Sequence, residues 1–220
     1  MNILCFDTTQ DWVHIALYSL VNEIEPVSLI EMVETKPKES SFQLVEWIGN
    51  VLEQAGIKRP DIIFVPNGPG SFTGIRITVS TARNLSQLWK IPVFAMDSLQ
   101  FYLSNIHKAE DQTLVCVDGK QNKYFCRFTK SNFMSESFDL EPNDIESKLL
   151  SGEWTPNNWY YTGQKPSFYP ENAKKIEATK LNFLSILSLL RGNLFHLNLE
   201  NNDYTTLVPN YLRGTYVDNK

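Results

Sequence analysis

The apolar and polar positions of this chain follow two different periods, and the change from one period to the other predicts its elements. Residues 2–6, 12–20 and 27–33 are short stretches rich in apolar and β-branched side chains, which is typical of strands. From about residue 41 to residue 55 the apolar positions recur at helical spacing, and a glycine follows as a stop signal. We therefore expect three strands before the first helix.

A second set of elements follows in alternation. Residues 61–65 form an apolar run that is typical of a parallel strand buried on both faces. Helical spacing continues through residues 75–89, before a short strand at residues 92–95 and a helix that begins near residue 97. The order β-β-β-α-β-α-β-α matches one lobe of the actin, Hsp70 and ribonuclease H superfold, in which a mixed sheet carries helices on its faces.

The pattern of apolar strands starts again after residues 107–111, where a weakly marked boundary between two lobes is expected. Residues 113–118 form another buried strand that ends in an aspartate, and residues 124–128 follow it as a second strand. We therefore expect an α/β protein of two lobes with mixed sheets flanked by helices. The first lobe is predicted to span residues 1–108 and the second residues 109–220.

The second lobe carries weaker signals than the first. Polar residues and prolines between residues 141 and 171 leave few strong elements. An apolar helix is expected after them, at residues 183–190. The second lobe is therefore interpreted as a shortened duplicate of the first.

A loop with three glycines, Gly68, Gly70 and Gly74, lies between a predicted strand and a predicted helix. Glycine allows positive φ and close backbone approach, and Ser71 or Thr73 is placed to cap the helix. A strand, a glycine loop and a helix N-terminus can together cradle an anion. The spacing matches neither a Walker loop nor the dinucleotide fingerprint, so spacing alone favours a tight structural turn.

Other candidate catalytic side chains lack suitable neighbours. A nucleophile elbow has glycines two residues before and two residues after its serine, and around Ser71 those positions are Pro69 and Thr73. The histidines are His14, His107 and His196. They lie far apart in the sequence and form no metal-binding motif, and His14 is expected to face solvent from an alternating strand.

Composition narrows the classes of function. The chain has 220 residues, 42% of them hydrophobic and 20% charged, which is ordinary for a globular protein with a sizeable core. A formal charge of −5 argues against a protein that grips RNA through a basic face of its own. Three scattered cysteines suggest a reducing compartment, and neither a signal peptide nor a membrane span is recognised. A cytoplasmic protein is expected.

Two aspartates stand where enzymes of the superfold handle ATP. Those enzymes carry one aspartate and a glycine-bearing phosphate hairpin on the first strand pair, and a second aspartate on the other lobe. Asp7 and Asp118 take these places, but the turn of Thr8, Thr9 and Gln10 has no glycine, so a phosphate cannot approach it as closely. We interpret Asp7 as a turn residue that caps local backbone N–H groups. Asp7, Thr8, Thr9 and Asp118 would then form at most a vestigial nucleotide site.

The first helix has more apolar surface than one sheet requires. Its polar side chains occupy an arc of only about 100°, and its apolar side chains spread over roughly 220°. The second helix has small residues from Gly74 to Ala82 that permit close approach of another helix, with Arg76 and Arg83 on one polar side. Another protein is one candidate to cover these helices, and the second lobe is the other.

The full residue sequence of the glycine loop is more specific than the spacing of its glycines. Residues 68–77 resemble the Gly-Pro-Gly-Ser-Phe-Thr-Gly-(apolar)-Arg-(apolar) motif of the TsaB (YeaZ) family, which is bacterial and serves tRNA modification. Further agreement comes from residues 1–9, from Val117 and Asp118 followed by Tyr124, and from residues 209–213. The resemblance covers the chain end to end but is loose between residues 131 and 207.

The chain departs from the family pattern in three places, two single residues and one pair. Asn67 stands where the family usually has glycine or arginine, and Thr78 where it usually has glycine. Ser40 and Ser41 replace the His-Ser or His-Thr pair that often opens the first helix, which weakens any catalytic role further.

The resemblance implies a pseudo-enzyme. TsaB-like proteins are non-catalytic relatives and partners of TsaD, which transfers a threonylcarbamoyl group to the adenosine beside the anticodon, and the ATPase TsaE joins the pair. No cofactor or metal is implied, and tRNA is met only through the complex. In that family the two helices pack against their counterparts in TsaD or in a second TsaB copy, so a homodimer is an alternative.

Carried over by position, the resemblance also implies two sets of residues. The partner interface would consist of Phe42, Val45, Trp47, Ile48, Leu52, Ile75, Arg76, Val79 and Arg83. The glycine loop, which would hold the second helix at a fixed angle, consists of Gly68, Gly70, Ser71, Phe72, Thr73 and Gly74. The N–H groups of that loop are candidates to touch a nucleotide at a shared interface.

Three rival functions belong to the same superfold or to distant relatives. An ATP-dependent phosphotransferase is supported by Asp7 and Asp118 and opposed by the missing hairpin glycine. A two-metal nuclease requires more carboxylates at strand ends than these two provide. A metalloprotease-like peptidase lacks its histidines.

Overall fold

The first sheet is built as the sequence predicts. The computed structural model describes residues 1–21, 25–34, 39–106, 111–131, 133–181, 183 and 204–212. The five strands of the first sheet are β1 (Asn2–Asp7), β2 (Val13–Val21), β3 (Glu25–Glu34), β4 (Ile62–Pro66) and β5 (Val93–Met96). Their order is β3-β2-β1-β4-β5, with β1, β4 and β5 parallel and β2 antiparallel to both of its neighbours.

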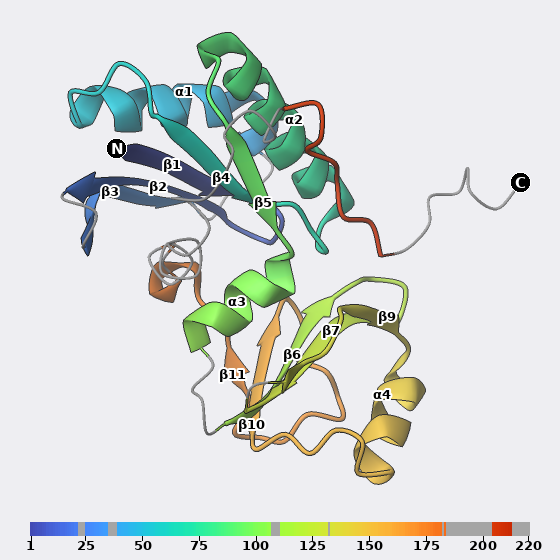
Figure 1. Cartoon of the computed structure of the whole chain (residues 1–220). Helices are drawn as coiled ribbons and strands as arrows, with labels where there is room; N and C mark the ends of the chain where they lie inside the picture. Colours follow the sequence, from blue (N-terminus) through green and yellow to red (C-terminus); the bar gives the residue numbers. More distant parts are fainter. Residues whose placement is uncertain are drawn as a thin grey trace, which may run out of the picture.

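Three helices cover the first sheet. Helices α1 (Ser40–Gln54) and α2 (Phe72–Trp89) lie side by side on one face of the sheet, and α3 (Ser98–Ile106) lies on the other face, toward the second sheet (Figure 1). Both faces of the central strands are therefore buried, and β4 is buried along its whole length. The predicted order β-β-β-α-β-α-β-α is confirmed.

The second sheet repeats the topology of the first. Its strands are β6 (Gln112–Asp118), β7 (Tyr124–Lys130), β8 (Phe133–Met134), β9 (Phe138–Leu140), β10 (Asn158–Thr162) and β11 (Lys174–Lys175). The order is β11-β10-β6-β7-β8, with β9 also on β7. Strand β6 is antiparallel to β7 and parallel to β10, as β1 is antiparallel to β2 and parallel to β4. The prediction of a shortened duplicate agrees with this topology, because β8, β9 and β11 have three residues or fewer.

Two second-lobe elements were missed by the pattern of apolar residues. Helix α4 (Pro142–Leu150) has a capping box between Glu141 and Asp144, but its single buried side chain is that of Ile145, so it gives almost no apolar period. Strand β10 is partly exposed along most of its length and begins with asparagine. A 3₁₀ turn also forms at Ala178–Lys180. Of the helix expected at residues 183–190, all but Phe183 lies outside the described residues.

The two sheets share one hydrophobic core. The same cluster contains Phe64 of β4, Phe101 of α3, and Val117 and Phe125 of the second sheet. Phe183 is fully buried in it and stacks on Phe101 with ring centroids 4.7 Å apart. A second cluster fills the space between the first sheet and helices α1 and α2. Among the described residues, no helix combines the length and the apolar character that a membrane crossing requires.

Candidate functional site

The glycine loop, residues 67–74, is closed onto the turn between β1 and β2. The backbone N–H of Ser71 donates to the carbonyl of Thr9 at 2.7 Å. The Thr8 hydroxyl donates to the carbonyl of Gly74 at 2.8 Å, and the Thr8 N–H donates to the Thr78 hydroxyl at 3.1 Å. The loop, the turn and the first two turns of α2 therefore form one hydrogen-bonded unit.

Two glycines of the loop are required by this closure. A Cβ on Gly74 would overlap the Thr8 carbonyl, and a Cβ on Gly70 would overlap the Thr9 carbonyl. Gly68 has a φ of 113°, so it alone of the three uses positive φ. Close backbone approach is thus confirmed, and the partner of that approach is the chain's own turn.

Most of the loop's N–H groups have partners within the chain. The N-cap of α2 is Ser71, whose hydroxyl accepts from the N–H of Gly74 at 3.3 Å, which decides between the two predicted caps. The N–H of Asn67 donates to Met96 O at 3.0 Å, and that of Gly68 donates to Ser98 Oγ at 3.1 Å. These N–H groups are therefore not available to an anion in this conformation.

Asp7 is fully buried and serves the turn. Its Oδ1 accepts from the N–H of Thr9 at 2.7 Å, and its Oδ2 accepts from the hydroxyl of Tyr102 at 3.3 Å. Burial raises the pKa of this carboxyl above its ordinary value, and the hydrogen bonds from Thr9 oppose that rise. The interpretation of Asp7 as a cap for local backbone N–H groups is confirmed.

Asp118 belongs to a separate network at the surface. Its Oδ1 accepts from the N–H of Lys120 at 2.8 Å, and its Oδ2 lies 2.6 Å from Lys120 Nζ. Between the two lobes, the Thr162 hydroxyl donates to Gln10 Oε1 at 2.7 Å in a buried contact. The described residues contain no group of three or more His, Cys, Asp or Glu side chains that could hold a metal ion.

The prediction that His14 faces solvent is wrong. The side chain is fully buried, its Nε2 lies 2.6 Å from Glu31 Oε1, and its ring centroid lies 5.0 Å from that of Phe183. An alternating strand is expected to expose one face, but residues 12–18 of β2 are all buried: α1 packs on the strand, and Phe183 lies against His14. The other two histidines lie outside the described residues.

The nine residues predicted to face a partner differ in exposure. Ile48, Leu52, Ile75 and Val79 are at most 5% exposed and pack in the core beneath α1 and α2. Phe42 is 71% exposed and Val45 58% exposed, both on α1. Trp47 and Arg83 are partly buried, and Arg76 is exposed. The small residues Gly74, Thr78 and Ala82 are buried against the chain itself, so they do not offer an approach to another helix.

A segment near the end of the described residues lies along α2. We call residues 204–212 the strap. The N–H of Asn210 donates to the Asn67 carbonyl at 2.8 Å, and the Asn67 side chain donates to the Val208 carbonyl at 3.0 Å. The Asn210 side chain also donates to Asp97 Oδ2 at 3.0 Å, and Asp97 Oδ1 lies 3.2 Å from Arg127 of β7. Sequence reasoning noted Asn67 and the motif at residues 209–213 but gave them no shared role.

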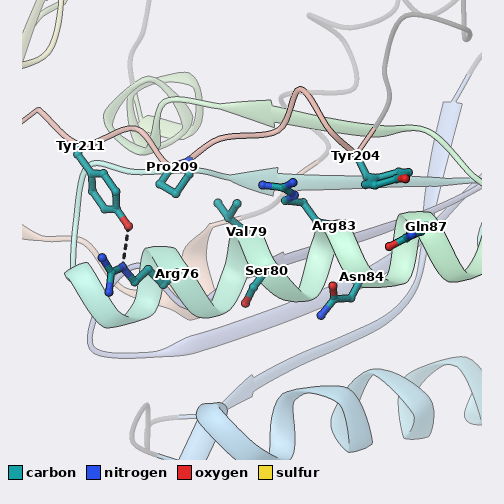
Figure 2. A pocket seen from close by; sticks show the side chains of 9 residues that line it. All are labelled: Arg76, Val79, Ser80, Arg83, Asn84, Gln87, Tyr204, Pro209 and Tyr211. Carbon is teal, nitrogen blue, oxygen red and sulfur yellow. Dashed lines mark hydrogen bonds between the residues drawn. The ribbon is translucent and has the colours of Figure 1, made fainter.

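The strap and α2 enclose a pocket of about 500 Å³. It is lined by Arg76, Val79, Ser80, Arg83, Asn84, Gln87, Tyr204, Pro209 and Tyr211 (Figure 2). Arg76 donates from Nε to the Tyr211 hydroxyl at 3.0 Å and lies 3.9 Å from the centroid of the Phe72 ring. Arg76 and Arg83 both line this pocket, and its described lining residues include no acidic side chain. The pocket is therefore positively charged, although the protein as a whole has a net negative charge.

Comparisons with known proteins find one family model and several relatives. The model of the family described as TsaD, tRNA N6-adenosine threonylcarbamoyltransferase, matches residues 34–136. The tRNA threonylcarbamoyladenosine biosynthesis protein TsaB of Buchnera aphidicola subsp. Schizaphis graminum is 28% identical over 191 residues, covering 81% of this chain and 86% of that protein. The protein of the same name from Escherichia coli is 24% identical over 70% of this chain and 69% of its own length.

A solved structure supports the same fold. YeaZ from Pseudomonas aeruginosa superposes with a TM-score of 0.63 at 19% identity, covering 96% of this chain and all of that one. Two mixed sheets of the same strand order, each with helices, define a protein of the two-lobed actin, Hsp70 and ribonuclease H class, as predicted. Within that class, the chain is similar to proteins of the TsaB (YeaZ) family.

Proposed function

We propose that this protein is a non-catalytic scaffold subunit in the biosynthesis of threonylcarbamoyladenosine in tRNA. In this proposal it pairs with and activates a TsaD-type transferase, recruits a TsaE-type ATPase, and meets tRNA only through the complex, in the cytoplasm. The shared name of its relatives supports the pathway. Residues 1–108 and 109–220 are proposed as the two lobes, each containing one sheet.

The closed glycine loop is the observation that carries the non-catalytic part of the proposal. A phosphate hairpin must leave backbone N–H groups free and allow the phosphate to come close. Here the Thr8 hydroxyl and the Thr9 carbonyl are both hydrogen-bonded to the loop, and the buried Asp7 carboxyl accepts from the Tyr102 hydroxyl. Opening this unit for a nucleotide would leave buried donors and acceptors without partners, at a cost of about 1–3 kcal/mol for each group.

The proposed partner surface is the outward face of α1 and α2. Phe42 and Val45 lie one helical turn apart on α1, and both expose more than half of their side-chain surface. Leu88 on the neighbouring helix α2 is exposed as well. Arg76 and Arg83 would add positive charge that steers an acidic partner toward the same helices. The buried members of the predicted interface would act by holding the two helices in position.

Pairing with a TsaD-type transferase from the same organism tests the proposal. The two chains are co-expressed, and complex formation is measured by size exclusion with light scattering. We expect a stoichiometric complex with the unaltered chain. Phe42→Glu should weaken it by about 100-fold or more, since a charge would be buried without a partner at the centre of the contact.

A matched control separates the surface from general damage. Phe133 of β8 is 62% exposed on the second sheet, so Phe133→Glu makes the same change at a similar exposure away from α1 and α2. It should leave pairing unchanged. Equal pairing by both variants would contradict the proposed surface. Absence of any complex, together with tight Mg-ATP binding by this chain alone in calorimetry, would favour the ATP-dependent phosphotransferase instead.

A further inference from the structure

Two of the three cysteines face each other across the second sheet. Cys116 of β6 and Cys126 of β7 are direct partners in the antiparallel register, and their Sγ atoms lie 2.7 Å apart. Both thiols are fully buried. Cys5, the third cysteine, is buried in the first sheet and serves as an internal reference.

The backbone pairing at this position suits a covalent link. The N–H of Gly119 donates to the Lys123 carbonyl, which makes that opposite pair a hydrogen-bonded one. Hydrogen-bonded and non-hydrogen-bonded pairs alternate along an antiparallel ladder, so three positions further in, Cys116 and Cys126 form a non-hydrogen-bonded pair. Such pairs have Cα atoms about 4.5 Å apart, within the range of about 4.4–6.8 Å that disulfides accept.

A second contact supports this assignment. Phe128 is two residues from Cys126, and both its N–H and its carbonyl bond to Ser135, on the side away from β6. The backbone of Phe128 therefore has no hydrogen bond left for β6, as expected at a non-hydrogen-bonded position. By the two-residue period of the strand, Cys126 is of the same kind.

We propose that Cys116 and Cys126 are a redox modification site, which a hydroperoxide converts to a cross-strand disulfide. One sulfur attacks the peroxide oxygen, so that an S–O bond forms and the O–O bond breaks, giving a sulfenic acid and releasing the other oxygen as water or an alcohol. The second sulfur then displaces the hydroxyl as water, forming the S–S bond. Both thiol protons leave with the oxygen atoms, and the peroxide takes up two electrons.

The surroundings of the pair set the rate of this reaction. Burial raises the pKa of the Cys126 thiol, so this thiol is protonated at neutral pH and reacts slowly. The cover over this part of the sheet includes α4, whose single buried side chain is that of Ile145. A helix held by so few apolar contacts opens more readily than the core, and its opening admits the oxidant.

Peptide mass mapping tests the proposal on the full chain. The folded protein is treated with hydrogen peroxide, quenched in acid, unfolded and alkylated. We expect most chains to lose two hydrogen atoms, with Cys116 and Cys126 in one linked peptide pair and Cys5 alkylated as a free thiol. A dithiol reductant should reverse the link.

Two variants complete the test. Cys5→Ala should keep the link, and Cys126→Ala should abolish it. The proposal is overturned if the treated wild-type chain yields Cys116 and Cys126 as separate free thiols or as unlinked oxygenated residues. A link between either cysteine and Cys5 would overturn it as well.

Discussion

The two sheets share a strand order, yet the turns that follow their first strands are stabilised in different ways. After β1, the side chains of Thr8, Thr9 and Gln10 are buried and bond to α2, to α3 and to the second sheet. After β6, residues 120–122 are exposed with positive φ, and Asp118 bonds to the nearby Lys120. The first turn is held by distant elements and the second by its own residues.

This difference shows that turns at the same place in two similar sheets can be stabilised by different parts of the chain. In the first lobe, the Asp7 carboxyl and the hydroxyls of Thr8 and Thr9 have intramolecular partners, and the turn is bonded to α2. In the second lobe, Asp118 at the corresponding turn bonds to Lys120 of the same turn. The first turn should therefore be sensitive to small changes and the second tolerant of them.

The largest expected effect comes from the point of closest approach. Gly74→Ala places a methyl group against the Thr8 carbonyl, so either the turn or α2 must move. We expect the free energy of unfolding in urea to fall by about 2–4 kcal/mol.

Gly49 of α1 is the control for that change, because a Cβ there meets nothing within 4 Å. Gly49→Ala should raise the free energy of unfolding by up to about 1 kcal/mol, through helix propensity alone. If the two substitutions had the same effect, the turn and the loop would not be in tight contact.

An intermediate effect is expected from Thr78→Val, which keeps the shape and removes the hydroxyl. The buried N–H of Thr8 would lose its acceptor, and stability should fall by about 1–3 kcal/mol in the same urea measurement. Thr81→Val changes the same residue type on a partly exposed position of α2 and should stay within about 0.5 kcal/mol. A Thr78 variant as stable as the Thr81 variant would argue against the hydrogen-bonded closure.

The smallest effects should distinguish the two aspartates. Because burial raises the pKa of Asp7 in the folded state, the folded protein binds its proton more tightly than the unfolded chain does, and stability is lost as pH rises through the folded-state pKa. Asp7→Asn keeps an acceptor for the Thr9 N–H and removes this loss, so at pH 7 it should be neutral or stabilising by up to about 1 kcal/mol.

Asp118→Asn provides the comparison in the second turn. It removes an ion pair whose lysine is 79% exposed, so stability should fall by about 0.5 kcal/mol or less. Unfolding in urea at several pH values between 4 and 8 measures both variants. A strong loss of stability with Asp7→Asn at neutral pH would show that the buried carboxylate is required in its charged form.

The first lobe could be predicted because its pattern and its packing agree. Strands rich in apolar residues and helices with a clear apolar period can be recognised from a short stretch of neighbouring residues. The cap at Ser71 and the role of Asp7 are also local, since each bonds within three residues. In the second lobe, the prediction missed elements whose apolar pattern is weak, such as α4, which has one buried side chain.

Contacts between segments that are far apart in the sequence could not be predicted from local sequence patterns. Nothing near Thr78 indicates that its hydroxyl meets Thr8, and Asn67 looked like a departure although it holds the strap through Val208. His14 was misjudged because the pattern of a strand reports its own alternation and not what covers its two faces. The exposed residues of the proposed interface could likewise be told from the buried ones only in the structure, where α1 and α2 are packed on the sheet.

The strap has a consequence for the order of events during synthesis. Leu207 is buried in the core beneath α2, and Asn210 bonds to Asn67, which leaves the ribosome well over a hundred residues earlier. Until the strap is made, α2 lacks part of its cover and the pocket around Arg83 has no second wall. A nascent chain must therefore wait with an incomplete first lobe while the second is translated. The half of the molecule that is synthesised first is completed last.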